Sequence, residues 1–317
     1  MNNSKNKILI VAGGTGGHIF PAIAMGQNNL KDCEVKYICG SRDLEQEIYK
    51  ASGINPEILK IPGSPFGVKN PFKIISRCFN ILRAFSQADK IIKSFKPDKI
   101  FLFGGYISFV PLVIALDKKI PVVIHEQNAV AGRVTRFAEK LGVKILTGWP
   151  NCKGIKNFEY YGIPTREIIK IDKNTALEKL NLKLDPNKKI IGIAGGSLGS
   201  GPLSKLLKNT AELCKNYEFV FLSSKEIYNE NNTHFLKSVW NINYFYSICD
   251  VLVCRSGGST LAEALKLKIP TITIFWPGAA DNHQEYNAKE FIKLAKNSYM
   301  FNQNDSAENL AKIILKM

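Results

Sequence analysis

The sequence predicts a protein of two α/β domains, each built on a parallel sheet with helices on both faces. The chain has 317 residues, which suits two domains of ordinary size. Short, almost continuously apolar strand patterns alternate with helical patterns along its length, as is typical of parallel sheets buried on both faces. Each half also begins with a strand that runs into a glycine-rich turn and a helix.

The strands and helices follow from hydrophobic periodicity. In the first half, strands are expected at Lys7–Ala12, Val35–Cys39, Lys99–Phe103, Val122–His125 and Lys144–Thr147. Helices are expected between them at Gly17–Leu30, Pro71–Phe95, Ile107–Leu116 and Ala131–Leu141. In the second half, strands are expected at Ile190–Ala194, Glu218–Leu222, Val251–Cys254 and Thr271–Phe275. Its helices are expected at about Pro202–Cys214, Ser259–Leu267 and Asn282–Ala295.

A domain boundary is expected near the middle of the chain, where Gly162 and Pro164 interrupt the pattern and a new series of strands follows. We therefore predict one domain over residues 1–162 and a second over residues 163–317. The charged segment 305–317 is predicted to form a terminal helix.

The net charge of +16 favours an anionic partner, such as nucleic acid, an acidic membrane surface or a phosphorylated substrate. The Lys- and Asn-rich composition of proteins from AT-rich genomes is an alternative explanation. No nucleic-acid recognition motif is present, so nucleic-acid binding is not expected. Seven cysteines without a C-x-x-C pair indicate reduced thiols instead of disulfides or a zinc site. The chain contains no apolar run long enough for a transmembrane helix and no signal peptide, so we expect a cytosolic protein.

Glycine-rich turns follow the first strand of each half, at residues 11–18 (VAGGTGGH) and 193–200 (IAGGSLGS). Such turns expose backbone N–H groups at a helix N-terminus, where phosphate binds well. A tight turn without a ligand is the alternative, but two loops at matching places favour binding. Neither loop is a P-loop, because no Gly-Lys-Ser/Thr follows, and neither fits the dinucleotide fingerprint.

Polar residues cluster where further strands end, at residues 104–108 (GGYIS), 125–128 (HEQN), 255–263 (RSGGSTLAE) and 281–288 (DNHQEYNA). In open α/β sheets this edge forms the binding crevice. His18, directly after the first loop, suits a proton acceptor at neutral pH, and a polar capping residue is the alternative. Glu263, about one turn into its helix, suits the diol of a ribose, and a surface glutamate is the alternative.

Taken in order, these motifs resemble those of the MurG family, which adds N-acetylglucosamine to the lipid-linked muramyl-pentapeptide called lipid I. The likeness runs from residue 7 to about 290. It implies a GT-B fold, in which two Rossmann-like domains face a cleft and the C-terminal helix crosses back to the first domain. It also implies UDP-N-acetylglucosamine as the donor, and an inverting transfer to a C4 hydroxyl with neither a metal nor a cofactor.

The resemblance places the functional residues by motif. Acceptor-side residues would be His18, Tyr106, His125 and Glu126. Donor contacts would fall on Thr15, Gly16, Gly17, Asn128, Arg166, Ser197, Val239, Gly258, Ser259, Thr260, Leu261, Ala262, Glu263 and Gln284. Three departures stand out. Leu198 replaces a usual Gln, the residues before Gln284 differ from the common arrangement, and the stretch 223–243 is short, so reduced activity or a relaxed donor preference is expected.

In the mechanism that the resemblance suggests, His18 is the first candidate for the base and Glu126 the second. The glycine-loop helix ends and Arg166 would stabilise the leaving UDP. Two other classes stay open at this point: an isomerase like the UDP-N-acetylglucosamine 2-epimerases, and a non-catalytic UDP-sugar-binding subunit.

The lipid acceptor implies a peripheral position on the cytoplasmic face of the bacterial inner membrane. We expect residues 65–95 to dock on an anionic bilayer, because apolar residues cover about half of the helical wheel of Pro71–Phe85 and basic residues rim them. The alternative is a helix fully buried by a neighbouring loop or a second subunit.

Overall fold

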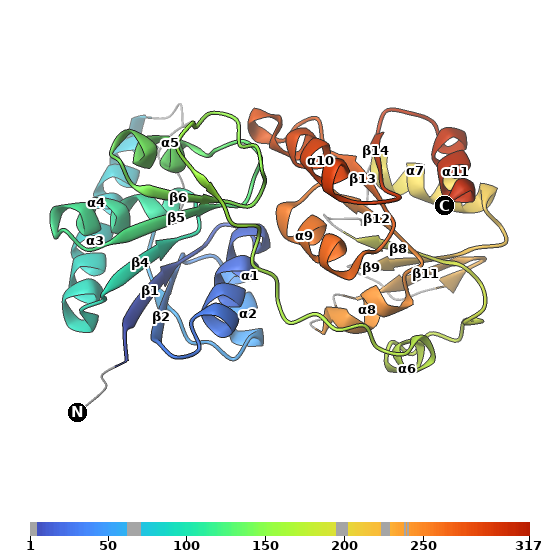
Figure 1. Cartoon of the computed structure of the whole chain (residues 1–317), viewed down its shortest axis with the longest axis horizontal. Helices are drawn as coiled ribbons and strands as arrows, with labels where there is room; N and C mark the ends of the chain where they lie inside the picture. The colour runs from blue at the N-terminus through green and yellow to red at the C-terminus, as the bar shows by residue number, and fades with distance from the viewer. Residues whose placement is uncertain (1–4, 62–70, 195–201, 223–228, 238, 240) are drawn as a thin grey trace. The chain divides into compact units, whose positions relative to one another are not determined.

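The protein folds into two α/β units, Met1–Glu167 and Ile168–Met317, in a computed structural model (Figure 1). The structure describes residues 5–61, 71–194, 202–222, 229–237, 239 and 241–317, and of 71–79, 202 and 229–230 only the backbone. The sequence predicts this boundary between residues 162 and 163.

The described residues of the first unit form one parallel sheet of seven strands. The strands are β1 (Lys7–Val11), β2 (Glu34–Cys39), β3 (Glu57–Ile58), β4 (Lys99–Leu102), β5 (Val122–Glu126), β6 (Lys144–Thr147) and β7 (Glu159–Tyr160). They lie in the order β3-β2-β1-β4-β5-β6-β7. The helices are α1 (Gly16–Ala24), α2 (Asp43–Ala51), α3 (Pro71–Phe95), α4 (Phe109–Asp117) and α5 (Arg133–Lys140), with a π-turn at Met25–Asn29 and a 3-10 turn at Tyr106–Ser108.

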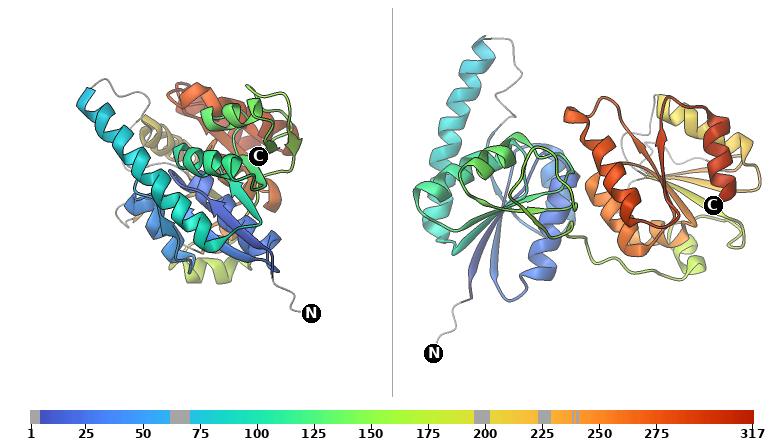
Figure 2. Two further views of the ribbon diagram at one scale, coloured as in Figure 1. Left: turned by 90° about the vertical axis from the view of Figure 1, so that its left-hand side faces the viewer. Right: turned by 45° about the horizontal axis from the view of Figure 1, so that its top comes forward.

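Helices cover both faces of this sheet, and successive side chains of each strand pack against opposite layers. In β1, Leu9 and Val11 pack with α3, α4 and α5, whereas Ile8 and Ile10 pack with α1 and α2. Successive side chains of a strand point to opposite faces, so a strand that is apolar throughout needs helices on both sides. Figure 2 shows α3 lying along one face, with its N-terminal end projecting beyond the sheet.

The second unit repeats this plan with a second seven-stranded sheet in its described part. Its strands are β8 (Ile190–Ala194), β9 (Glu218–Leu222), β10 (Asn229–Glu230), β11 (Thr233–Leu236), β12 (Val251–Arg255), β13 (Thr271–Phe275) and β14 (Tyr299–Asn302). The order is β10-β11-β9-β8-β12-β13-β14, and only the β10–β11 pair is antiparallel among the described pairs. The helices are α6 (Lys173–Lys179), α7 (Pro202–Leu213), α8 (Ile242–Ile248), α9 (Gly258–Leu267), α10 (His283–Leu294) and α11 (Ala307–Lys316), with a 3-10 turn at Ala280–Asn282.

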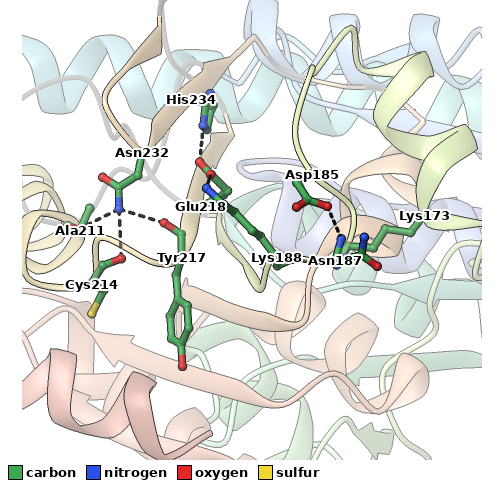
Figure 3. Close-up of polar contacts among 10 residues, drawn as sticks. All are labelled: Lys173, Asp185, Asn187, Lys188, Ala211, Cys214, Tyr217, Glu218, Asn232 and His234. Atoms are coloured by element: carbon green, nitrogen blue, oxygen red, sulfur yellow. Dashed lines mark hydrogen bonds and ion pairs between the residues drawn. The ribbon is translucent and has the colours of Figure 1, made fainter.

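The side chain of Asn232, directly before β11, links the end of α7 to the start of β9 (Figure 3). Asn232 Nδ2 donates to the carbonyls of Ala211, Cys214 and Tyr217 at distances of 2.9–3.1 Å. The carbonyls of Ala211 and Cys214 also accept from the backbone N–H groups of Cys214 and Tyr217, so the Asn232 amide adds to a turn that already has backbone hydrogen bonds. One side chain therefore reinforces the connection between α7 and β9.

The terminal segment 305–317 contains a helix, α11, and the expectation that it crosses back to the first domain stays a prediction. Leu310 and Ile314 of α11 are fully buried in the core of the second unit, together with Leu207 of α7. The apolar stripe of α11 is therefore used within its own unit. Within the described residues, no helix is long and apolar enough to cross a membrane.

Candidate active site

Three of the predicted motifs meet at one edge of the first sheet. They follow β1, β4 and β5, which are neighbours in the sheet although the chain visits β2 and β3 between β1 and β4. From β1 the chain continues to β2 on one side, and from β4 it continues to β5 on the other side. Open α/β sheets bind ligands at such a point, where the direction of the strand order reverses.

The loop after β1 is held from beneath by Glu45, a fully buried residue of α2 that the sequence analysis missed. Its carboxylate accepts hydrogen bonds from Gly14 N at 2.9 Å and from Gly40 N at 2.6 Å. The hydroxyl of Tyr106 lies 3.3 Å from the same carboxylate. Glu45 therefore ties together the loops that follow β1, β2 and β4. A signal existed in the sequence, because Glu45 shares one helical stripe with the buried Ile48 and Tyr49.

His18, in the first turns of α1, lies against the residues after β5. Its Nδ1 is 2.6 Å from Gln127 Oε1, and Gln127 Nε2 is 2.9 Å from His125 Nδ1. His125 Nε2 is 2.7 Å from the carbonyl oxygen of Gly162. Burial lowers the pKa of His125 to about 4, although the Gly162 carbonyl opposes this. His125 is therefore neutral near pH 7, with both ring nitrogens engaged, and this arrangement does not support direct contact with a substrate.

Glu126 was the second candidate for the base, but its geometry supports a structural role. It is 2% exposed. One carboxylate oxygen accepts from the backbone and side-chain nitrogens of Asn128, and the other accepts from Gly132 N and Thr135 Oγ1. With four donors on it, the carboxylate holds the loop after β5 and the start of α5 in place. No oxygen is left directed at an acceptor hydroxyl.

Gly104 and Gly105 carry the backbone past His18. Both are in the left-handed region, with φ of 71° and 73°. A Cβ on Gly104 would lie 3.5 Å from the ring of His18. Glycine is required at these positions because other residues adopt such φ values at a cost. Gly104 and Gly105 therefore let the loop after β4 pass close to the ring of His18, which stays partly exposed.

The remaining first-unit residues lie on or near the same edge. Thr15 is the exposed N-cap of α1 without a side-chain cap bond, and Gly16 and Gly17 form the first turn. An anion bound at this end of α1 would interact favourably with the helix dipole. Arg166 lies with its guanidinium carbon 4.2 Å from the centroid of the Phe20 ring on α1.

In the second unit, the residues predicted to bind the donor start α9 directly after β12. Gly258, Ser259 and Thr260 form its first turn, and no side chain caps it at Gly257. Leu261 is buried, so it can offer a ligand only its backbone, and Ala262 is half-buried. Glu263 is 3% exposed, and its Oε2 accepts from the hydroxyl of Tyr246 on α8 at 2.7 Å. Tyr246, which the sequence analysis missed, orients the carboxylate predicted to hold the ribose.

In the segment after β13, the side-chain amides of Gln284 and Asn287 form hydrogen bonds with backbone groups. Gln284 Oε1 accepts from Trp276 N at 3.0 Å, which closes the loop that leads into α10. Asn287, in the predicted 281–288 cluster, is fully buried and donates its amide to the carbonyl of Ser256 at 3.0 Å. Val239 is half-buried. Ser197 and Leu198 lie outside the described residues. Among the residues with described positions, no group of three His, Cys, Asp or Glu side chains is arranged to hold a metal ion.

Two Rossmann-like units with glycine-rich turns at the strand carboxyl ends define the GT-B class of glycosyltransferases. The N-terminal domain model of glycosyltransferase family 28 matches residues 8–147, and the C-terminal domain model of that family matches residues 190–317. The chain belongs to glycosyltransferase family 28, in its MurG branch.

Curated relatives support this placement. A UDP-N-acetylglucosamine–N-acetylmuramyl-(pentapeptide) pyrophosphoryl-undecaprenol N-acetylglucosamine transferase of Protochlamydia amoebophila is 31% identical over 92% of this chain and 81% of its own length. The enzyme of the same name from Elusimicrobium minutum is 32% identical over 95% of this chain and 86% of its own length. Neither the isomerase nor the non-catalytic alternative finds support among these relatives.

Solved structures share the fold. The crystal structure of Acinetobacter baumannii MurG superposes with a TM-score of 0.71 at 24% identity, over 98% of this chain and 90% of that one. The kitacinnamycin glycosyltransferase superposes with a TM-score of 0.67 at 13% identity, over the same shares of the two chains. The GT-B fold predicted from the motifs is thus confirmed.

Proposed function

We propose that this protein transfers N-acetylglucosamine from UDP-N-acetylglucosamine to the C4 hydroxyl of the muramyl sugar of lipid I. The names of the relatives support this choice of donor and acceptor. The observation that carries it is His18, a half-buried histidine at the switch point of the first sheet whose Nδ1 is engaged by Gln127. Among the described residues, no hydrogen bond occupies its Nε2.

In the proposed reaction the acceptor O4 attacks the anomeric carbon from the side opposite UDP. The O4–C1 bond forms, the bond from C1 to the UDP oxygen breaks, and the O4 proton passes to His18 Nε2. The N-terminus of α9, which no side chain caps at Gly257, would offset charge on the departing diphosphate. Glu263, oriented by Tyr246, would hold the ribose.

Radiolabelled UDP-N-acetylglucosamine with a short-chain lipid I analogue tests the reaction directly, with an acceptor-free reaction as control. Product that needs the acceptor supports transfer, whereas acceptor-independent conversion of the sugar nucleotide would contradict it. His18→Ala should lower turnover by about 100-fold or more, as for loss of a general base, and leave donor binding intact. UDP at about 100 times its Kd should stabilise the protein by about 2.7 kcal/mol, and NAD should not.

We further propose that the protein works at an anionic membrane surface and docks through the face of residues 65–95. Residues 62–70 and the side chains of residues 71–79 lie outside the described part of the structure. The side chains of Lys73 and Phe79 are therefore not described. On the described turns of α3, Ala84 and Ala88 face the core while Leu82 is 66% exposed beside Arg83. An exposed leucine next to a cation suits an interfacial contact.

Sedimentation with vesicles tests this docking. Binding should rise with the fraction of anionic lipid, fall with salt, and weaken in Leu82→Ser with Arg83→Glu. Lys179→Glu, at an exposed position of α6 outside this face, is the matched control and should bind nearly as the wild type does. Equal sedimentation with neutral and anionic vesicles would contradict the proposal.

A further inference from the structure

Three side chains, including that of His18, and one backbone carbonyl form a line of hydrogen bonds whose proton positions can be worked out. The line runs from His18 through Gln127 and His125 to the carbonyl of Gly162, with distances of 2.6, 2.9 and 2.7 Å. Gln127 is 2% exposed and His125 is fully buried. Water therefore cannot replace either partner without a rearrangement.

The carbonyl oxygen of Gly162 determines which nitrogen of His125 carries the proton. A carbonyl oxygen can only accept, so His125 Nε2 must carry a hydrogen. Burial holds the pKa of His125 at about 4, which leaves the ring neutral with a single N–H at neutral pH. His125 Nδ1 is then unprotonated and must accept.

The amide of Gln127 is oriented by this requirement. Its nitrogen must face His125 Nδ1, and the same nitrogen donates to the backbone carbonyl of His125 at 2.8 Å, so both of its hydrogens are used. Its oxygen must then face His18. Trp149, itself buried, donates from Nε1 to the backbone carbonyl of Gln127 at 3.0 Å and anchors the residue from below.

We infer that Gln127 is a positioning residue that keeps the hydrogen of neutral His18 on Nδ1 and so leaves the Nε2 lone pair as the base. An amide oxygen can only accept, so the His18 nitrogen 2.6 Å from it must donate. In Ser–His–Asp triads a carboxylate sets the tautomer in this way. An amide does so without placing another negative charge beside two diphosphate-bearing substrates. This inference rests on the proposed function for the role of Nε2, but the proton positions do not.

The chain contains four histidines, which makes the tautomers directly measurable. Long-range ¹H–¹⁵N correlation of ¹⁵N-histidine-labelled protein near pH 8, assigned with His18→Ala, should show His18 protonated on Nδ1 and His125 on Nε2. A neutral His18 protonated on Nε2 would overturn the inference. This measurement needs no substrate, so a wild-type enzyme that fails to transfer sugar would refute the proposed function separately.

Kinetics of two variants add a second test. Gln127→Met keeps the volume but removes the amide, and should lower kcat by about 10- to 100-fold, the usual cost of losing a residue that orients a functional group. The KM for UDP-N-acetylglucosamine should change little. Gln127→Glu keeps an acceptor beside His18 and adds a charge that favours its protonated form. It should retain more activity than Gln127→Met and move the acid limb of the kcat/KM profile to higher pH.

Gln46→Met is the matched control, because Gln46 is a half-buried glutamine whose amide also bonds a backbone carbonyl, that of Ser41. It should leave the pH profile of kcat/KM unchanged. Equal losses in Gln127→Met and Gln127→Glu, with the acid limb unmoved and both proteins folded by circular dichroism, would show that Gln127 serves packing alone and would overturn the inference.

Discussion

Removing the carboxylate of Glu45 should loosen the glycine-rich loop and destabilise the first unit. The side chain is fully buried and accepts from Gly14 N and Gly40 N, with the Tyr106 hydroxyl nearby. A buried donor left without an acceptor costs about 1–3 kcal/mol. With Gly40 buried and Gly14 partly so, we expect Glu45→Ala to lower the free energy of unfolding by about 3 kcal/mol.

The assay can be confined to the unit that is affected. Trp149 is the one tryptophan of residues 1–167 and is fully buried, so urea unfolding followed by its fluorescence in a Trp240→Phe, Trp276→Phe background reports that unit. Glu45→Gln, which retains one acceptor oxygen, should lose about half as much stability. Glu47→Ala, on the exposed side of the same helix, should stay within about 0.5 kcal/mol of the wild type. A Glu45→Ala midpoint equal to that of Glu47→Ala would refute the reasoning.

Two further predictions concern the second unit. Tyr246→Phe removes the hydroxyl that donates to Glu263 at 2.7 Å, so it should weaken UDP binding measured by calorimetry, and unchanged affinity would show that the bond does not serve the ligand. Burial opposes ionisation of Glu218, but hydrogen bonds from His234 and Lys188 outweigh it and lower the pKa of Glu218 (Figure 3). Its folded pKa lies below its unfolded pKa, so this stabilisation is present above the ordinary glutamate pKa of about 4.3 and is lost as pH falls through the folded value. Unfolding free energies measured between about pH 6 and 3 should therefore fall less steeply in Glu218→Gln, and an unchanged slope would count against the pair.

The central strands were predictable because their burial leaves a direct trace in the sequence. Ile190–Ala194 and Thr271–Phe275 form strands with the predicted bounds, since a strand covered on both faces must be apolar throughout. Helix α2 was missed because a buried carboxylate interrupts its apolar stripe. The two-residue strands β3 and β7 left no trace, because a pair of residues carries no periodicity.

The site was predictable as a set of loops but not as a set of contacts. Glycine and polar residues after apolar strands located the edge of each sheet, and the order of the sheets brings the first-unit loops together. Which partner each side chain takes depends on tertiary packing. His18 and Gln127 are 109 residues apart, and nothing local marks their bond. The roles of Thr15, Arg166, Gln284 and the α9 residues stay predictions.

The lengths of the outermost strands bear on how the protein behaves at high concentration. Open sheet edges offer unpaired backbone groups that can recruit another chain. Three of the four edges in the described sheets, β3, β7 and β10, are only two residues long, and each contains a glutamate. A template this short and charged gives a foreign strand little to pair with. The four-residue β14 is the longer exception, so unwanted edge-to-edge association should be sought there first when the protein is concentrated or redesigned.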